Sequence, residues 1–137
     1  MPNINPAMTD IGSSSKLSGV SAKMIRHYEA IGLLKKVARS QANYRLYGPA
    51  DIHLLRFIKR ARDLGFSINE IRELLSLWQN KSRPSAAVKK IASKHVGELK
   101  RKIAELKSMA DTLEHLTHHC HGDLRPECPI LDDLGKG

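Results

Sequence analysis

Apolar residues recur at helical spacing along most of the chain, so we expect a mainly α-helical protein. Residues 12–17 are predicted to form a short helix that ends at Ser18-Gly19. Ser21 is a suitable N-cap for a second helix that extends to about Ala30. Two short helices joined by a tight turn with glycine are typical of a helix-turn-helix, although other small helical hairpins share the pattern.

A basic segment after this helix pair is predicted to form a β-hairpin. Val37 on one side, and Tyr44 with Leu46 on the other, can form two short strands around a turn at residues 40–43. A basic hairpin directly after a helix-turn-helix is typical of the wing of a winged-helix domain.

Two more helices are predicted before residue 80. Proline is favoured at the first helical position, so Pro49 begins the third helix, which extends to Gly65. Ser67 and Glu70 have the spacing of a capping box at the start of the fourth. Each helix carries an apolar stripe that we expect to lie in the core: Ile52, Leu55, Ile58 and Leu64 in the third, and Ile68, Ile71, Leu74, Leu75 and Trp78 in the fourth.

A helix of about 33 residues is predicted after the linker at residues 80–84, and its length of roughly 50 Å is too great for its stripe to be buried against one small domain. Four heptads follow Lys89. Their d positions are Ala92, Leu99, Leu106 and Leu113, and their a positions are Val96, Ile103, Ala110 and Thr117. This pattern indicates a coiled coil and hence a homodimer, but it does not fix whether the two helices run parallel or antiparallel.

The charge of the chain favours a polyanionic partner. The 137 residues carry a net charge of +9, and residues 1–65 hold eleven Lys and Arg against four Asp and Glu. No apolar run of membrane-spanning length and no signal-peptide pattern is present, so we expect a cytoplasmic protein without a membrane partner. No set of nucleophile, base and orienting residue stands out, so an enzyme is not expected.

Two cysteines, Cys120 and Cys128, follow the long helix, and Gly122 and Pro126 allow the chain between them to turn back. Two soft thiolates suit a linear site for a monovalent d¹⁰ ion such as Cu(I) and are too few for tetrahedral zinc. A redox switch that closes a disulfide remains an alternative. Four nearby histidines could also complete a Cys₂His₂ zinc site, or could be favoured only by the helix dipole: His115, His118, His119 and His121.

In its motifs the sequence resembles the MerR family of metal- and drug-responsive transcription regulators, and within it the copper-responsive CueR-type branch. The motifs run through nearly the whole chain and are Ile11-Gly12, the segments 18–29 and 31–34, Asn43-Tyr-Arg-Leu-Tyr47, the segment 61–67 with Ile71, and the Cys120-x₇-Cys128 loop. The three consecutive serines at residues 13–15 depart from the family pattern, which is usually apolar or alanine there.

The resemblance implies three parts: a winged helix-turn-helix DNA-binding domain at residues 9–80, an antiparallel coiled-coil dimerisation helix at 85–119, and a metal-binding loop and tail at 120–137. It also implies contacts with double-stranded promoter DNA. The residues that match the family's contact positions are Lys23, Arg26, His27 and Tyr28 on the second helix, Arg39, Tyr44 and Arg45 in the wing, and Arg62 on the third helix. The alternatives are that some of the charged residues are only solvated and that Tyr28 or Tyr44 belongs chiefly to the core.

Divalent-metal sensors of this family carry a cysteine where this chain has Ser85. The resemblance therefore implies Cys120 and Cys128 as ligands of Cu(I), with Ag(I) or Au(I) as mimics. Metal binding would distort the promoter so that RNA polymerase can start transcription. The alternatives are a divalent-metal (Zn, Cd, Pb or Hg) regulator of the same fold and a metal chaperone or buffer.

Overall fold

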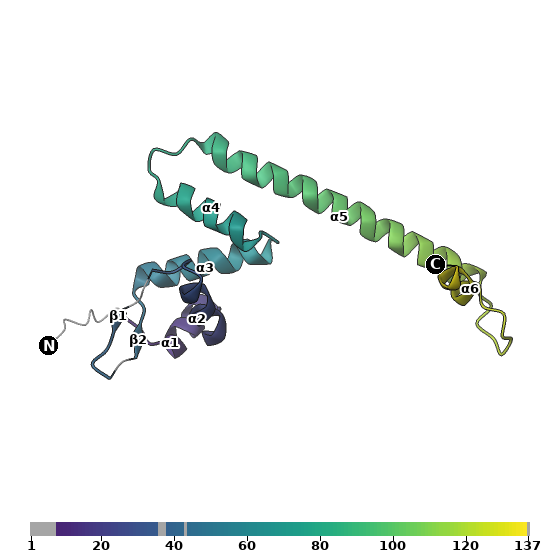
Figure 1. Cartoon of the computed structure of the whole chain (residues 1–137), viewed down its shortest axis with the longest axis horizontal. Coiled ribbons are helices and arrows are strands. Elements are labelled where there is room, and N and C mark those ends of the chain that lie inside the picture. Colours follow the sequence, from purple (N-terminus) through teal and green to yellow (C-terminus); the bar gives the residue numbers. More distant parts are fainter. Residues whose placement is uncertain (1–7, 36–37, 43, 137) are drawn as a thin grey trace. The chain divides into compact units, whose positions relative to one another are not determined.

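The computed structural model describes residues 8–35, 38–42 and 44–136, and these residues are mainly helical, as predicted. The elements are α1 (Ile11–Ser18), α2 (Ala22–Ala30), β1 (Ala38–Arg39), β2 (Arg45–Leu46), α3 (Pro49–Asp63), α4 (Ile68–Gln79), α5 (Ser85–His119) and α6 (Pro129–Gly135) (Figure 1). The chain divides into two compact units, Met1–Val88 and Lys89–Gly137. Each unit is described by itself.

Helix α1 is one residue longer at each end than predicted because polar groups cap both ends. The Asp10 Oδ1 atom accepts a hydrogen bond from the Ser13 amide at 2.7 Å, and this contact holds the pKa of Asp10 below its ordinary value. Gly19 ends the helix in the left-handed region with φ 77°, which glycine adopts at little cost.

Of the three serines at residues 13–15, only Ser14 is buried, and the structure shows why a serine is tolerated there. Ser14 is fully buried, its hydroxyl donates to the Asp10 carbonyl at 2.6 Å, and it lies 2.7 Å from the Thr9 hydroxyl. The Ser18 hydroxyl accepts from the Val20 amide at 3.1 Å. Because hydrogen bonds offset the cost of desolvating a hydroxyl, Ser14 and Ser18 can lie buried in α1.

The core of the first unit lies between the helix-turn-helix and the helices α3 and α4. Its buried apolar residues are Val20, Ile25, Tyr28, Leu33, Leu34, Tyr47, Ile52, Leu55, Ile58, Ala61, Ile71 and Leu75. Four residues of the predicted stripes are not among them: Ile68 and Leu74 are only partly buried, and Leu64 and Trp78 are exposed. Leu64 follows the last helical residue of α3 and is 47% exposed, and Trp78 is 36% exposed and stacks on Phe57, with ring centroids 4.7 Å apart.

The predicted hairpin is present. The strands β1 and β2 are antiparallel, and Thr9 pairs with Tyr47 as an isolated bridge beyond them. Ser40 closes the turn, because its amide donates to the Tyr44 carbonyl at 2.8 Å and its hydroxyl accepts from the Tyr44 amide at 3.2 Å. The predicted strand residue Val37 and turn residue Asn43 lie outside the described residues.

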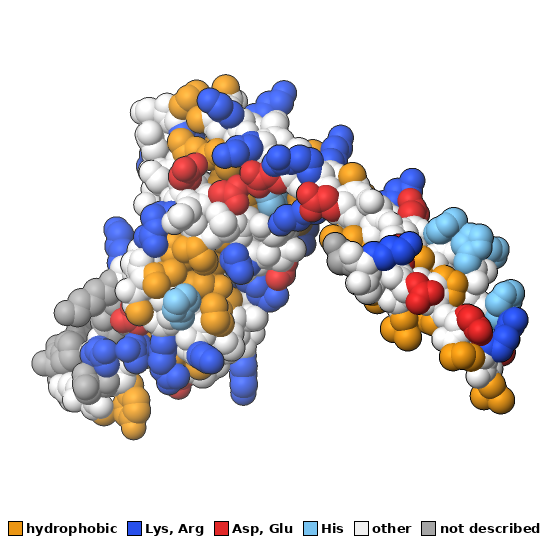
Figure 2. Space-filling view, turned by 45° about the vertical axis from the view of Figure 1, so that its right-hand side comes forward, with side chains coloured by type: hydrophobic (Ala, Val, Ile, Leu, Met, Phe, Trp, Pro, Cys, Tyr) orange, Lys and Arg blue, Asp and Glu red, His pale blue; other side chains and the backbone are white. Residues whose placement is uncertain are grey.

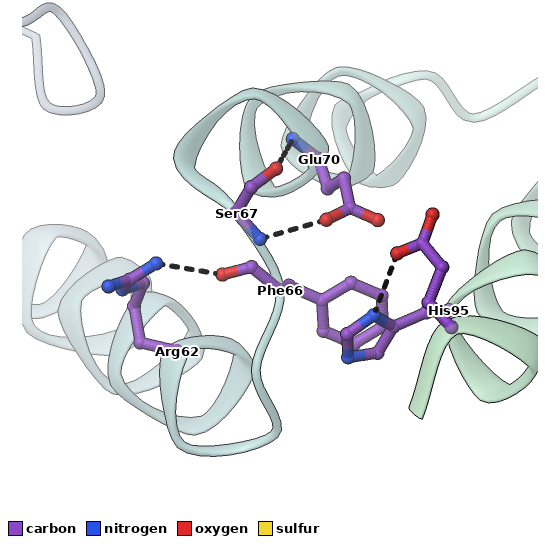
Figure 3. Close-up of polar contacts among 6 residues, drawn as sticks. Arg62, Phe66, Ser67, Glu70 and His95 are labelled. Atoms are coloured by element: carbon purple, nitrogen blue, oxygen red, sulfur yellow. Dashed lines mark hydrogen bonds and ion pairs between the residues drawn. The ribbon is translucent and has the colours of Figure 1, made fainter. Parts of the chain in front are cut away.

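The start of α4 confirms the predicted capping box. The Ser67 amide donates to Glu70 Oε1 at 2.9 Å, and the Glu70 amide donates to the Ser67 hydroxyl at 3.1 Å (Figure 3). In the last turn of α3, the Arg62 guanidinium donates to the Phe66 carbonyl at 3.0 Å (Figure 3). These contacts fix the short connection between α3 and α4.

The second unit consists of most of α5 and of the short helix α6. α5 is 35 residues long, close to the predicted length. Its heptad stripe is exposed in the single chain, most strongly at Ile103 and Leu106, both 63% exposed. α6 was not predicted, and it begins with Pro129 at a position that favours helix initiation. Among the described residues, no helix is long and apolar enough to cross a membrane.

Candidate nucleic-acid interface and metal-binding loop

Helix α2 separates a core face from a cationic outer face. Ile25 is buried in the core, whereas Lys23, Arg26 and His27 are exposed. Tyr28 was predicted with these three as a DNA contact, but it is only 5% exposed and belongs to the core. The outer face of α2 therefore offers two permanent cations and one imidazole to a partner.

The wing is tied to α2 by a cluster of polar side chains. Arg45 of β2 donates through Nε to Glu29 Oε2 of α2 at 2.9 Å, and the Tyr47 hydroxyl donates to the same oxygen at 3.4 Å. Tyr47 is fully buried, and burial together with the Glu29 carboxylate raises the pKa of Tyr47 to about 12. Arg45 is half-buried and paired with Glu29, whereas the side chains of the wing residues Arg39 and Tyr44 are exposed.

A hollow of about 440 Å³ lies between α2 and the wing. Arg26, Lys35 and Arg45 line it together with a single carboxylate, Glu29. Three cations against one anion make it electropositive, so it can accept a phosphate oxygen. Lys35 was not among the predicted contact residues, although its place in the basic segment after Leu34 was a signal in the sequence.

Arginines of α3 and α4 hold the ends of the helix-turn-helix. Arg56 of α3 donates to the carbonyl of Leu17 in the last turn of α1 at 3.0 Å. Arg72 of α4 donates to the carbonyl of Ile31 just after α2 at 2.9 Å. Arg62, a predicted phosphate contact, is exposed and donates to a carbonyl of its own connection.

Many of the basic residues of the first unit lie near one another on its surface. Figure 2 shows Lys and Arg side chains gathered on the lower part of this unit. With the exposed side chains of α2 and of the wing, this distribution is suited to contact with the phosphate backbone of a duplex.

The two predicted metal ligands lie at the two ends of one loop, residues 120–128, which we call the thiol loop. Cys120 directly follows α5, and its amide donates to the Thr117 carbonyl at 3.2 Å. Cys128 is the N-cap of α6, and its carbonyl accepts from the Asp132 amide at 3.0 Å. Both cysteines are free thiols of intermediate exposure.

Within the thiol loop, polar contacts and one glycine set the path of the backbone. Gly122 adopts φ 63°, in the left-handed region. The Asp123 carboxylate accepts from the Arg125 amide at 2.9 Å and from Arg125 Nε at 2.7 Å. The sequence prediction of a turn between the cysteines is thus confirmed, and the contact between Asp123 and Arg125 was not foreseen.

The histidines near the loop are not equivalent. His115 and His119 lie one turn apart on α5, and their ring centroids are 4.4 Å apart. His118 and His121 are exposed, as are His115 and His119. Among the described residues, none of the four is grouped with both thiols closely enough for the three side chains to share one ion.

Comparison with known proteins identifies relatives of this chain. The family profile described as "MerR HTH family regulatory protein" matches residues 10–78, and the one described as "MerR, DNA binding" matches residues 52–116. The HTH-type transcriptional regulator HmrR of Sinorhizobium medicae is 56% identical over 128 residues, which cover 93% of this chain and 87% of the relative. The regulator CueR of Salmonella typhimurium is 39% identical, with 91% of each chain covered.

Among solved structures, the chain is similar to the transcription regulator PbrR691 of Ralstonia metallidurans CH34 in complex with lead(II). The TM-score is 0.79 and the identity is 32%, and the match covers 92% of this chain and 98% of the other.

Proposed function

Because the chain belongs to the MerR family of transcriptional regulators, we propose that it activates transcription in response to Cu(I) while bound to promoter DNA as a homodimer. It is a metal-responsive transcription regulator and not an enzyme. We propose further which metal the protein senses, which residues bind that metal and which residues contact DNA.

The pair of free thiols at the ends of the thiol loop carries the choice of Cu(I). Cys120 and Cys128 are separated by a loop that turns back, and neither is in a disulfide. Soft thiolates favour soft ions, and two of them satisfy the linear coordination of a monovalent d¹⁰ ion. Cys120 and Cys128 would hold Cu(I), and Ag(I) or Au(I) would bind as mimics.

The start of α5 supports the same choice. Ser85 is the first residue of this helix, and in an antiparallel dimer it would lie near the thiol loop of the partner chain, where divalent-metal sensors of the family carry a third thiol. A serine hydroxyl is a poor ligand for soft metals. The positive charge of Lys89, one turn later, can offset the negative charge of a bis-thiolate site.

Divalent-metal sensing is the second candidate function. It is favoured by the likeness to PbrR691, whose structure contains lead(II). In that case, further donors from near the thiol loop or from a second chain would complete the higher coordination number that these ions prefer.

We assign DNA binding to the winged domain, residues 9–80. The exposed Lys23, Arg26 and His27 would enter a groove or contact its rim, while the wing residues Arg39, Tyr44 and Arg45 and the α3 residue Arg62 would contact the backbone. Tyr28 would act from within the core by packing under α2. We place this activity in the cytoplasm.

Dimerisation is assigned to α5, because its exposed leucines and isoleucine continue the heptad pattern between residues 92 and 117. Two chains would then present two winged domains to a two-fold symmetric operator.

Metal capture would act on the DNA through two states of the dimer. Ordering of the thiol loop against the Ser85 region of the partner chain would favour the state in which the winged domains bend and untwist the promoter, so that RNA polymerase can use it. A coupling free energy of about 1–3 kcal/mol is typical of such a switch and corresponds to a 5- to 150-fold change.

The test is transcription in vitro from the protein's own promoter with RNA polymerase and buffered Cu(I), Zn(II), Pb(II) or Hg(II). We expect activation by Cu(I), and its loss in Cys120→Ser and in Cys128→Ser without loss of promoter binding. His121→Gln, which changes a donor inside the same loop, is the matched control and is expected to respond normally. Activation by a divalent ion and not by Cu(I), or failure of His121→Gln, would favour the second candidate.

A further inference from the structure

We propose that His115 and His119 form a second metal site, separate from the two thiols, that takes a borderline divalent ion such as Zn²⁺, Ni²⁺ or Cu²⁺. The observation behind it is the contact of the two imidazole rings, whose centroids are 4.4 Å apart at an interplanar angle of 69°. Figure 2 shows imidazole side chains gathered toward one end of the second unit.

The spacing of the two histidines suits chelation. Residues four apart lie on the same face of a helix, one turn above the other. Histidines at this spacing on one helical face are a known zinc-binding arrangement, in which each imidazole supplies one nitrogen. His115 and His119 are both exposed, so their rings can rotate to direct one nitrogen each at a shared ion, with water as the other ligands.

The two rings lie away from the surface that dimerisation would cover. At roughly 100° per residue, the side of α5 that carries His115 and His119 is nearly opposite the heptad positions Ala110, Leu113 and Thr117. The site therefore stays accessible in a coiled-coil dimer.

The donor chemistry separates this site from the thiol loop. Imidazole nitrogen suits Zn, Cu and Ni ions, whereas thiolates select softer ions. The proposal consequently does not depend on Cu(I) binding at Cys120 and Cys128.

Binding of an ion at this site would stabilise the last turn of α5. The last four carbonyls of a helix lack partners within the helix, so its final turn opens readily. A single ion that bridges His115 and His119 spans that turn, and Cys120 follows it directly. A divalent ion would thereby fix the point at which the thiol loop begins.

The experiment uses the full-length variant Cys120→Ser/Cys128→Ser, so that no thiol competes for the ion. Isothermal titration with Ni²⁺ should give one ion per chain. His115→Gln or His119→Gln, added to this background, should weaken Ni²⁺ binding by more than about tenfold. Loss of a residue that only hydrogen-bonds to a metal ligand commonly lowers metal affinity by about tenfold or more, and loss of a ligand itself should have a larger effect. His118→Gln, on the same final turns, and His53→Gln, in the first unit, are the matched controls and should bind as the parent does.

A spectroscopic measurement on the parent variant makes the proposal testable without the histidine substitutions. Electron paramagnetic resonance with one equivalent of Cu²⁺ should show two coordinated imidazole nitrogens. Failure of the thiol-free protein to bind Ni²⁺, an equal loss in His118→Gln, or a signal from a single nitrogen would each overturn the proposal. Circular dichroism verifies that the exposed substitutions leave the helix intact.

Discussion

Replacing Glu29 by glutamine should loosen the attachment of the wing to α2. Glu29 accepts from Arg45 at 2.9 Å and from the Tyr47 hydroxyl at 3.4 Å. Glutamine keeps the shape and one acceptor oxygen but loses the charge. The variant therefore tests the ion pair while leaving the packing of α2 almost unchanged.

The expected loss follows from the burial of the two partners. The Glu29 side chain is 14% exposed and that of Arg45 is 31% exposed. The free energy that the pair contributes should therefore lie between that of an exposed salt bridge, about 0–1 kcal/mol, and that of a buried hydrogen bond to a charged group, about 1.5–3 kcal/mol. Because solvent screens Arg45, we expect Glu29→Gln to lower the free energy of unfolding by about 1–2 kcal/mol.

Urea unfolding followed by tryptophan fluorescence measures this loss. Trp78 is the only tryptophan in the chain, and it lies in α4 of the first unit, so its signal reports the unit that contains the pair. Protein concentration must be kept constant because dimerisation contributes to apparent stability. The cycle of Glu29→Gln, Arg45→Met and the double variant isolates the coupling energy, which we expect to be about 1 kcal/mol.

Strict additivity of the two substitutions would refute the reasoning, since it would mean that Glu29 and Arg45 do not stabilise each other. A matched control is Glu73→Gln on the exposed surface of α4, which should change the free energy of unfolding by less than about 0.5 kcal/mol.

Three further outcomes are expected. Burial and Glu29 raise the pKa of Tyr47 from 10.0 to about 12, so the folded state holds the phenolic proton more tightly than the unfolded state does. The protein should therefore lose up to about 3 kcal/mol of stability as the pH rises from 10 to 12. Urea midpoints across this range measure the loss, and Tyr47→Phe should not show it. Arg26→Ala should weaken operator binding by about 1–3 kcal/mol if Arg26 contacts a base, or lower by about 1 the slope of log affinity against log salt concentration if it contacts a phosphate. Fluorescence anisotropy at several salt concentrations measures both, and an unchanged affinity would contradict the assigned role of α2. Ile103→Glu should dissociate the dimer in analytical ultracentrifugation, and a variant that still sediments as the wild type does would show that the heptad stripe is not the interface.

Elements whose ends depend on local contacts were predictable from the sequence. Ser21 and Pro49 mark the starts of α2 and α3, and the pair Ser67 and Glu70 marks the start of α4, because capping involves residues within one turn. The helix α6 was missed since seven residues are too few for a periodic pattern to be legible.

Features that depend on tertiary contacts were not predictable. Ser14 is buried because Thr9 and Asp10 supply its partners, which an apolar pattern cannot reveal. Tyr28 has the residue type of a DNA contact, but the face of α2 on which it lies packs inward.

The candidate DNA-binding site also has features that the sequence predicts and features that it does not. The types and positions of the exposed cations on α2 follow from the sequence, whereas the hollow between α2 and the wing exists only because the hairpin returns to α2. The Glu29 to Arg45 contact joins residues sixteen positions apart. No local spacing rule predicts it.

The bonds from Arg56 to the carbonyl of Leu17 and from Arg72 to that of Ile31 make α3 and α4 the frame that holds the ends of α1 and α2. We expect a tilt of α4 to move the end of α2, because the Arg72 guanidinium links α4 to the carbonyl of the residue that follows α2. In the proposed complex with DNA, the position of α4 would therefore influence the angle at which α2 meets a groove.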